Sequence, residues 1–536
     1  MKIINVVKRN IFLDSIQILH ISEEVKKLPG VIDAAIVMGT DLNKELLEKE
    51  GLLLDEGRKA HPNDIIIAVK IVDESYKDKV LSEIEKMLSV IPKAEETYYS
   101  IDDALAVLRD ANIAVVSVPG QYARDTVIKL LEKDIHVFLF SDHVPLEHEI
   151  ELKKMAIEKG LLLMGPEAGT SIINGVGLGF ANAVNRGPIG VVAAAGTGLQ
   201  EFTVLVTLGE SGISQAIGVG SRDLSEAVNG LMTLQALTAL EEDSETQVIA
   251  LISKPPALSV QKRIIKYIIE KGRKKYVTCF IGGKEFDVPN SSKGRIIQTF
   301  TLHAAALEAL RLVSKDLYER AYERFTLSKE EILRIAEKEF NRLDSRQKYI
   351  RGLYTGGTFT YEALVLLDFL IGNVYSNTPL KKEFALRNPW RSFKHTIVDL
   401  GAEEFTAGRA HPMIDPTIRL QRILDEAKDP EIAVILLDFV LGYGAHHNPA
   451  TAHVEYIKRA KKIAEEDGRY LVVVAHICGI DKDPQNAAKQ EEILKGAGVI
   501  TLPTNAMAVL VSAIIANRGI ANNKLDAFYE YYLARH

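Results

Sequence analysis

Apolar runs and helical stretches alternate along most of the chain. Runs rich in Val, Ile and Leu cover residues 213–219, 246–252, 275–283, 395–401, 431–442 and 469–479. Such continuous runs, separated by amphipathic helices, are typical of parallel strands covered on both faces. We therefore predict an α/β fold in which two tandem flavodoxin-like, doubly wound parallel-sheet domains occupy residues 187–312 and 347–536.

Each tandem domain opens on a Gly-Thr turn that leads into a helix. The segments are AAAGTGLQE at 193–201 and YTGGTFTYE at 354–362. The free N–H groups and the positive dipole end of such a helix favour an anion. The predicted phosphate-binding residues are Gly196, Thr197, Gly198, Gly356, Gly357 and Thr358. Glu201 and Glu362 follow the two turns at the same spacing, and we predict that they orient a reacting group.

Two further segments have a recognisable pattern. Residues 1–92 follow a β-α-β-α-β-α order, which suits a small α/β sandwich used for packing or regulation. Residues 313–346 are highly charged, with apolar residues at helical spacing, and Ser328 with Glu331 forms a capping box. We predict a helical connector between the tandem domains.

The richest polar segment follows the apolar run at 395–401, where open α/β sheets bind ligands. It contains Glu403, Glu404, Thr406, Arg409, His411 and Asp415. Arg409 suits a carboxylate or phosphate because its guanidinium forks, and His411 suits proton exchange near neutral pH. We predict Arg409 and His411 as catalytic residues and Glu403 and Asp415 as substrate-loop residues. The alternative is a surface loop in which Asp415 is a local cap.

Two later loops also end apolar runs of the second tandem domain. Asn448 lies in the first, and Asp483 and Gln485 lie in the second, so we add these three to the substrate loop. His446, His447 and His453 raise the alternative of a metal, which the adjacent spacing disfavours, so we predict none. Cys478 ends one run, and we interpret it as a packed thiol rather than a nucleophile.

The net charge, the number of cysteines and the length of the apolar runs exclude several classes of protein. A net charge of −7 argues against a nucleic-acid partner, and two cysteines cannot form a disulfide framework or a thiolate zinc site. The most apolar late run, 506–517, is shorter than the ~20 residues a membrane span needs. We expect no signal peptide, because Lys8 and Arg9 interrupt any apolar stretch at the start. We expect a cytoplasmic enzyme or enzyme subunit without a membrane partner.

Residues 93–186 resemble part of a known family. The stretches VVSVPGQYARDTVIKLLEKDIHVFLFSDHVPLEHE at 115–149 and LMGPEAGTSIINGVGLGFAN at 163–182 resemble the CoA-binding domain of the succinyl-CoA synthetase alpha-subunit superfamily. The resemblance implies a CoA-binding-like Rossmann domain over 93–186 and makes CoA a possible cofactor. The implied cofactor-binding residues are Pro119, Gly120, Pro145, Gly165, Pro166 and Glu167.

Within that superfamily the chain is similar to FdrA proteins. The motifs are the stretch 163–182, EEFTAGRAHPMIDPTIR at 403–419, LGYGAHHNPA at 441–450 and CGIDKDPQN at 478–486. The resemblance implies a subunit of an oxamate carbamoyltransferase in allantoin and purine nitrogen catabolism. Such a complex converts oxalurate and inorganic phosphate to oxamate and carbamoyl phosphate, with companion subunits, and we expect an oligomer.

The chain also departs from the ligase pattern of the superfamily. It has no Gly-His-Ala-Gly turn for a phosphohistidine, and Ala168 stands where the family loop has Cys. His303 is nearest to the expected place, but its neighbours predict an exposed or partly packed helical His. No G-x-x-x-x-G-K-[ST] segment is present, so any ATP would bind a partner. The alternatives are an acid-thiol ligase (acyl-CoA synthetase) subunit and a non-catalytic scaffold subunit.

Overall fold

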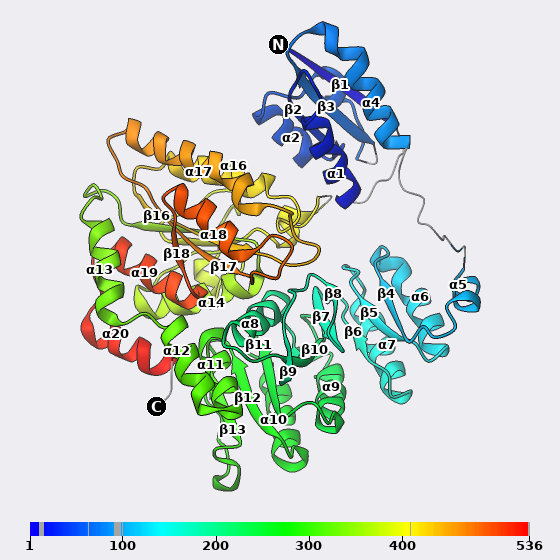
Figure 1. The fold of residues 1–536 in the computed structure, drawn as a ribbon, viewed down its shortest axis with the longest axis vertical. Helices are drawn as coiled ribbons and strands as arrows, with labels where there is room; N and C mark the ends of the chain where they lie inside the picture. The colour runs from blue at the N-terminus through cyan, green and yellow to red at the C-terminus, as the bar shows by residue number, and fades with distance from the viewer. Residues whose placement is uncertain (10–14, 63, 90–97, 99, 408, 534–536) are drawn as a thin grey trace. The chain divides into compact units, whose positions relative to one another are not determined.

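The computed structural model describes residues 1–9, 15–62, 64–89, 98, 100–407 and 409–533. They form two compact units, shown in Figure 1. The first unit contains Met1–Val107 and Ala402–Asp415. The second contains Leu108–Gly401 and Pro416–His536. The predicted domain boundary between residues 92 and 93 lies outside the described residues.

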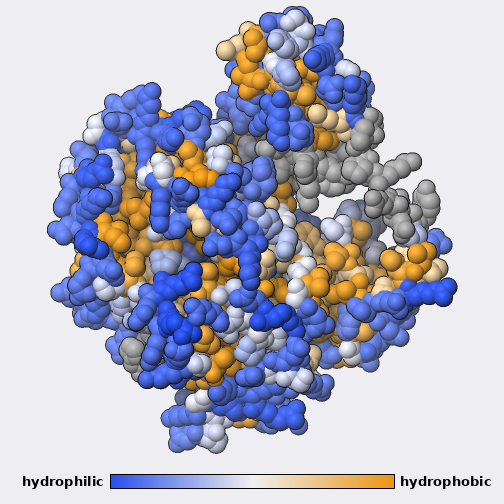
Figure 2. Space-filling model, viewed as in Figure 1, coloured by the Kyte–Doolittle hydropathy of each residue, from blue (hydrophilic) through white to orange (hydrophobic). Residues whose placement is uncertain are grey.

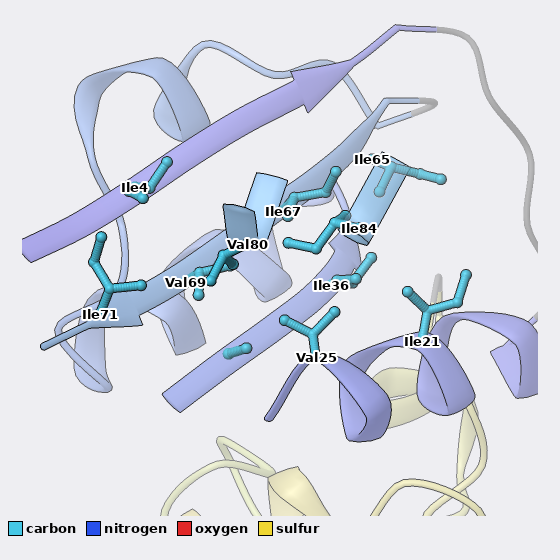
Figure 3. Close-up of a cluster of buried hydrophobic side chains, with 11 residues drawn as sticks. Ile4, Ile21, Val25, Ile36, Ile65, Ile67, Val69, Ile71, Val80 and Ile84 are labelled. Carbon is cyan, nitrogen blue, oxygen red and sulfur yellow. The ribbon is translucent and has the colours of Figure 1, made fainter. Parts of the chain in front are cut away.

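The first unit is built on a three-stranded antiparallel sheet. The strand order is β1 (Lys2–Lys8), β3 (Ile65–Ile71), β2 (Val31–Met38). Alternate residues of β3 point to opposite faces. Ile65, Ile67 and Val69 join a core with α1 (Ser15–Lys26) and α4 (Lys77–Ser89), which Figure 3 shows. Ile66 and Ala68 pack instead with the segment of α2 (Asp41–Lys49) and α3 (Asp55–Arg58).

The predicted β-α-β-α-β-α order of this unit has two additions. The helix α3 lies between α2 and β3, and a 3₁₀ turn, η1 (Glu74–Tyr76), precedes α4. A short helix, α5 (Ile101–Val107), ends the N-terminal part of the unit.

The second unit begins with a small parallel sheet of order β4 (Ile113–Val116), β5 (His136–Leu139), β6 (Leu163–Met164). Its crossover helices are α6 (Gly120–Glu132) and α7 (Leu146–Glu158). The edge strand β4 exposes Val115, and Leu108 before it is also exposed. Figure 2 shows apolar side chains over this part of the surface, as over several other parts in this view.

Two larger sheets follow, and their parallel strands have the same order. The first contains β9 (Arg186–Ala193), β10 (Ile213–Gly218), β11 (Val248–Ser253), β12 (Lys275–Phe280) and β13 (Ile296–Thr299). The second contains β14 (Tyr349–Tyr354), β15 (Thr396–Asp399), β16 (Ile432–Val440), β17 (Val472–Cys478) and β18 (Ile500–Leu502). In each, the first strand lies between the second and third, which is the flavodoxin-like order. The predicted fold class is confirmed.

A hairpin extends the first of these sheets and changes a predicted boundary. The strands β7 (Thr170–Ile173) and β8 (Val176–Gly179) pair with each other, and β7 pairs with β10. Residues 170–179 therefore belong to the sheet of the first tandem domain rather than to the CoA-binding-like sheet. Asn174 and Gly175 adopt positive φ at the turn, which is the preferred chemistry of a two-residue hairpin loop.

Helices cover both large sheets. Those of the first are α8 (Gly196–Leu208), α9 (Leu231–Glu242), α10 (Leu258–Lys271) and α11 (Leu302–Val313), with the short turn η2 (Asn290–Ser292). Those of the second are α14 (Gly357–Leu370), α16 (Thr417–Ala427), α17 (Pro449–Glu466), α18 (Ala487–Gly496) and α19 (Asn505–Asn517), with η3 (Lys382–Phe384). The chain continues into α20 (Asn522–Phe528) and the π-helical turn η4 (Tyr529–Leu533).

The connector consists of α12 (Lys315–Phe325) and α13 (Lys329–Phe340), and the Ser328–Glu331 capping box is confirmed. Within the described ranges, no helix is long and apolar enough to cross a membrane. The apolar run at 506–517 forms most of α19, whose side chains are almost all buried.

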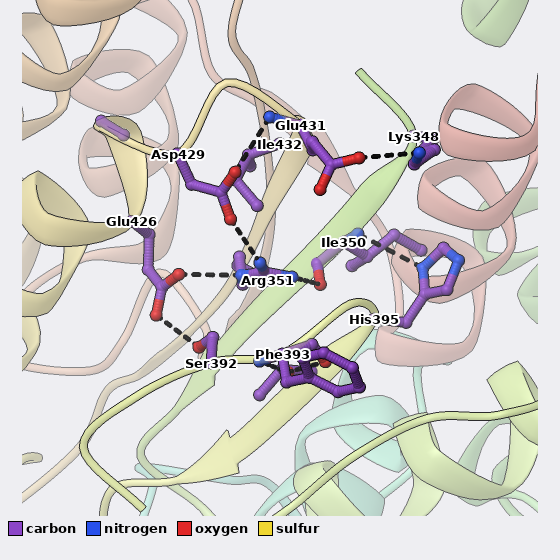
Figure 4. Close-up of polar contacts among 12 residues, drawn as sticks. Lys348, Ile350, Arg351, Ser392, Phe393, His395, Glu426, Asp429, Glu431 and Ile432 are labelled. Atoms are coloured by element: carbon purple, nitrogen blue, oxygen red, sulfur yellow. Dashed lines mark hydrogen bonds and ion pairs between the residues drawn. The ribbon is translucent and has the colours of Figure 1, made fainter. Parts of the chain in front are cut away.

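A buried arginine fixes the base of β14, the strand that leads to the second Gly-Thr turn. Arg351 is almost fully buried, its Nε donates to Glu426 Oε2 at 2.8 Å, and its Nη2 donates to Asp429 Oδ2 at 2.8 Å (Figure 4). A guanidinium is tolerated in a core only with such partners. The network holds the strand against α16 and the start of β16.

Candidate functional site

The site is the place where the N-termini of α8 and α14 meet, and Figure 1 shows the two helices side by side. A Cβ added to Gly356 would lie 2.6 Å from Thr197 Cγ2, and a Cβ added to Gly198 would lie 2.9 Å from Thr358 Cγ2. Each helix thus places a threonine over a glycine of the other. Glycine is required at both positions because a side chain would separate the two turns. The six predicted phosphate-binding residues come together here.

The first N–H groups of both helices lack a side-chain cap. The residues before them, Ala195 and Gly356, make no side-chain hydrogen bond to the helix. By contrast, Thr301, Thr504 and Ser328 cap α11, α19 and α13 through their hydroxyls. Gly196 is exposed and Gly357 is half-buried, so solvent reaches the first turn of each helix. Uncapped, accessible N–H groups are the donors that bind an anion at a helix N-terminus.

A buried network holds the turn before α14 in place. Asp438 of β16 accepts from the Thr355 N–H at 2.8 Å and from the Thr355 hydroxyl at 2.7 Å. Arg419 Nη1 donates to Asp438 at 2.8 Å, and Arg419 Nε donates to His453 Nε2 at 2.9 Å. Burial and the Arg419 charge hold the pKa of His453 well below its usual range. His453 is therefore a neutral acceptor within this network.

Glu201 forms a buried pair with a histidine of the second sheet. His476 Nε2 lies 2.8 Å from Glu201 Oε2, and both side chains are almost fully buried. The other ring nitrogen, Nδ1, lies 3.2 Å from the Leu502 carbonyl oxygen. Burial lowers the pKa of His476, but Glu201 and the carbonyl outweigh that effect, so its pKa is raised. Both ring nitrogens face acceptors, which is the arrangement of an imidazolium paired with a carboxylate.

Glu362 is held between the starts of two other helices. Its Oε1 accepts from the Leu302 N–H of α11 at 2.8 Å, and its Oε2 accepts from Asn505 Nδ2 of α19 at 2.8 Å. Burial raises the pKa of Glu362 to about 7, although these two donors act in the opposite direction. The Glu201 charge raises it further and the His476 charge lowers it. A carboxyl group that changes charge near neutral pH is thus coupled to the Glu201–His476 pair.

This pKa predicts a pH dependence of stability. The folded chain binds a proton at Glu362 more tightly than the unfolded chain, whose reference pKa is 4.5. Its stabilising contribution is therefore present below pH 4.5 and is lost as the pH rises through about 7, a change of about 3 kcal/mol. We expect the thermal midpoint of the wild type to fall more steeply between pH 5 and 8 than that of Glu362→Gln. Parallel curves would contradict a raised pKa at this position.

The site thus gives both predicted catalytic glutamates internal partners. Glu201 contacts His476, and Glu362 contacts two helix N-termini. Their predicted role in orienting a reacting group stays a prediction. Sequence analysis missed His476 and Asn505 because neither lies in a motif. The signal in the sequence that could have indicated them is their position, since His476 lies near the end of a predicted strand and Asn505 lies at the start of a predicted helix.

The six implied cofactor-binding residues gather at the carboxyl edge of the β4–β5–β6 sheet. Pro119 and Pro145 precede α6 and α7. A Cβ on Gly120 would lie 2.3 Å from the Asp142 carbonyl oxygen, and one on Gly165 would lie 2.2 Å from the Leu139 carbonyl oxygen. Backbone packing alone is therefore enough to explain both glycines. Their presence does not by itself indicate that CoA binds. Glu167, next to Pro166, accepts from the Ser221 hydroxyl at 3.0 Å.

The loop with Arg409 and His411 belongs to the first unit, together with Glu403 and Asp415. Arg409 Nε donates to Asn43 Oδ1 of α2, in the N-terminal domain. The structure therefore does not assemble this loop within the unit that holds Glu201 and Glu362. Burial lowers the pKa of His411 to about 4, which disfavours proton exchange near neutral pH, and its catalytic role stays a prediction. Sequence order alone could not show that this segment packs with residues far before it.

The three other substrate-loop residues are engaged in internal hydrogen bonds. Asn448 caps α17 through Thr451. Asp483 accepts from the Ala183 N–H at 2.7 Å and from Asn182 Nδ2 at 2.8 Å. Gln485 hydrogen-bonds both the N–H and the carbonyl of Gly442. These contacts join the strand ends of the second sheet to each other and to residues 182–183, and substrate contact by these residues stays a prediction.

The structure also tests the expectations for His303 and Cys478. His303 is fully buried between the Thr504 and Thr326 hydroxyls, at 3.1 and 3.0 Å, and burial lowers its pKa to about 3. The expectation of an exposed or partly packed His is therefore wrong. Cys478 is a buried thiol, and burial together with Glu201 raises its pKa well above the usual range. Its interpretation as a packed thiol is confirmed.

Two family profiles match parts of the chain. A profile described as CoA-ligase matches residues 353–515, and a profile described as AllF, heavy metal-associated domain, matches residues 1–101. A thiolate site for a heavy metal does not fit residues 1–101, since the two cysteines are Cys279 and Cys478. Among the described side chains, no group of three potential ligands is placed to hold a metal ion.

Several individual proteins are also similar to this chain. The succinate–CoA ligase alpha subunit of Methanothermobacter thermautotrophicus is 26% identical over 191 residues, which are 35% of this chain and 62% of that protein. The crystal structure of PH0766 from Pyrococcus horikoshii covers 79% of this chain and 87% of its own, at 16% identity and a TM-score of 0.31. The uncharacterized protein YahF of Escherichia coli is 41% identical over 500 residues, which are 92% of this chain and 95% of YahF. The chain therefore belongs to the same family as YahF, a family of FdrA/AllF-like proteins related to succinyl-CoA synthetase.

Proposed function

We propose that the chain is a subunit of a phosphate-dependent carbamoyltransferase that acts on oxalurate. It works with companion subunits in an oligomeric complex and forms oxamate and carbamoyl phosphate. The observation that carries the proposal is the pair of uncapped helix N-termini at Gly196 and Gly357. These termini supply backbone N–H donors for inorganic phosphate.

The chemistry requires positioning rather than a covalent enzyme intermediate. An oxygen of phosphate attacks the carbamoyl carbon of oxalurate, and the bond from that carbon to the amide nitrogen of the oxamate part breaks. The proton that phosphate carries moves to the leaving nitrogen, so atoms and charge balance. The helix N-termini hold the attacking phosphate and favour the negative charge that develops during attack.

The histidines near the site support this choice over a phosphohistidine cycle. His476 is committed to Glu201 and the Leu502 carbonyl, and His303 lies between two threonine hydroxyls. A phosphoryl acceptor needs a free ring nitrogen that reaches the donor. Neither ring has one in this arrangement, whereas the anion site needs no such residue.

A second candidate is an acid-thiol ligase subunit related to acyl-CoA synthetases. The match of residues 353–515 to a CoA-ligase profile favours it, as does the cluster of implied cofactor residues at one edge of the β4–β5–β6 sheet. In that function, Pro119, Gly120 and Gly165 would lie beside CoA, which supplies the thiol. The nucleotide would bind a companion chain.

One assay separates the two candidates. The purified chain, alone and with its companion subunits, is incubated with oxalurate and labelled inorganic phosphate, and in parallel with ATP labelled at its γ-phosphate, CoA and succinate. We expect labelled, acid-labile carbamoyl phosphate that depends on oxalurate, and no thioester. Thioester formation with labelled phosphate on the chain would replace the proposal with the ligase, and the absence of both products in the complete complex would support a scaffold.

A further inference from the structure

Lys254 lies where an α/β sheet of this type binds its ligand. It directly follows β11, which pairs with β9, and β9 leads into the turn of α8. In the flavodoxin-like order, the crevice outside the carboxyl ends of the first and third strands is the ligand position. These strands are β9 and β11. The side chain of Ile252, near the end of β11, is 3.4 Å from the place of a Cβ on Gly198.

Lys254 shares this place with a carboxylate from the other sheet. A Cβ on Gly357 would lie 2.6 Å from Asp399 Oδ2 and 4.0 Å from Lys254 Nζ, so both groups flank the start of α14. Asp399 ends β15, and its Oδ1 accepts from the Gly401 N–H at 3.0 Å. The Lys254 ammonium lies over the ring of Tyr361, 5.3 Å from the ring centroid.

The Lys254 side chain is reached by solvent and is also surrounded by protein atoms. The residue is exposed to solvent, yet surrounding protein lowers the pKa of its ammonium, against the opposite effect of Asp399. A side chain on a convex surface would keep its ordinary pKa. Solvent exposure and a lowered pKa together describe an ammonium that water reaches in a recessed position. Such a group is available to a ligand.

The charges of Lys254 and Asp399 favour different positions for phosphate and for an organic substrate. Asp399 lies beside the start of α14, and two like charges about 4 Å apart repel by about 1 to 4 kcal/mol in an accessible site. Phosphate between the two helix N-termini is therefore expected to lie nearer to the more exposed start of α8 than to Asp399 at the start of α14. Lys254 suits an organic carboxylate, because an ammonium is a compact cation with rotatable donors. Asp399 suits an N–H donor, because an ionised carboxylate is an acceptor.

We infer that Lys254 and Asp399 form the recognition site for the organic substrate, a small carboxylate that carries an adjacent amide or ureido N–H. Lys254 binds the carboxylate and Asp399 accepts from the N–H, while phosphate occupies the α8 side. The inference rests on the proposed function and adds the two residues that determine substrate class. They lie at the carboxyl ends of strands of the two different sheets, so the substrate is recognised across the junction of the tandem domains.

Substrate binding and turnover in the complete complex test the inference. Lys254→Met is expected to weaken oxamate binding in calorimetry, and to raise the KM for oxalurate, by roughly 10- to 150-fold, the range for a charge-assisted hydrogen bond. Phosphate binding and the phosphate KM should stay within about threefold. Lys254→Arg should recover part of the loss. Lys262→Met, an exposed lysine of α10, is the matched control and should behave as wild type.

The outcomes separate this inference from the proposed function. If wild type makes no carbamoyl phosphate, the proposed function fails whatever the variants do. If wild type is active and Lys254→Met has an unchanged oxalurate KM, the inference fails alone. A loss of phosphate affinity with unchanged oxamate affinity would assign Lys254 to phosphate and would overturn the division. Asp399→Asn, which keeps the shape of the side chain, should reproduce the oxamate effect if Lys254→Met folds poorly.

Discussion

Replacing Gly356 by Ala is expected to separate the two helix N-termini and to lower turnover by about 100-fold or more. The added Cβ would lie 2.6 Å from Thr197 Cγ2 and 2.9 Å from Thr197 Cβ, which is closer than packed carbon atoms approach. A displacement of about 1 Å at a reacting centre costs on the order of 100-fold in rate. Overpacking of this kind also destabilises by about 1 to 3 kcal/mol. Turnover in the reconstituted complex and the thermal midpoint are the measurements.

Matched glycine substitutions sharpen this result. Gly496→Ala, at the end of α18, meets no atom within 4 Å and should have wild-type turnover. Gly198→Ala meets Thr358 Cγ2 at 2.9 Å and should reduce turnover less than Gly356→Ala, because a threonine methyl group can turn away. Adding Thr358→Ser removes that methyl group and should restore activity. If Gly356→Ala is as active as Gly496→Ala, the close contact of the two turns has no functional role.

Replacing His476 by Leu is expected to destabilise the second unit by about 3 to 5 kcal/mol. The substitution leaves the Glu201 carboxylate buried without its 2.8 Å partner, and an uncompensated buried charge has a cost of that size. The double variant His476→Leu/Glu201→Met removes both charges and should recover most of the loss, since an apolar pair of similar volume replaces the ion pair. Urea denaturation of the full chain measures both variants.

An exposed pair provides the comparison. Lys348 and Glu431 are 2.7 Å apart, and both side chains are about half exposed, in the same region as Arg351 (Figure 4). Glu431→Gln should change the free energy of unfolding by only about 0 to 1 kcal/mol. Equal destabilisation by the single and the double His476 variants would show that packing, rather than the buried charge, explains the loss.

The sequence pattern predicted the repeated sheet well because its strands are continuous apolar runs. β16, with every residue buried, is the clearest case. The two Gly-Thr turns were found for a related reason, since a helix that starts directly after a buried strand needs a small residue there. The hairpin β7–β8 was missed although its Asn174-Gly175 dipeptide is a strong local turn signal.

The polar part of the site was harder to predict because it is made by contacts across the two sheets. Glu201 meets His476, and Glu362 meets Leu302 and Asn505, over long separations in sequence. Lys254 carries no motif and becomes notable only once β9 and β11 are adjacent. The dense polar pattern of the loop with Arg409 predicted a catalytic position, and its contact with Asn43 shows that it packs in the first unit. Its catalytic role stays a prediction.

The most direct test of the central claim is the position of a phosphate mimic in a crystal of the full chain. Crystals grown with tungstate would mark the anion through its anomalous scattering. We predict tungstate within hydrogen-bonding distance of the backbone N–H groups that begin α8 and α14, nearer to Gly196 than to Gly357. Tungstate bound elsewhere, or no ordered tungstate at this junction at saturating concentration, would contradict the claim that the paired helix N-termini hold phosphate.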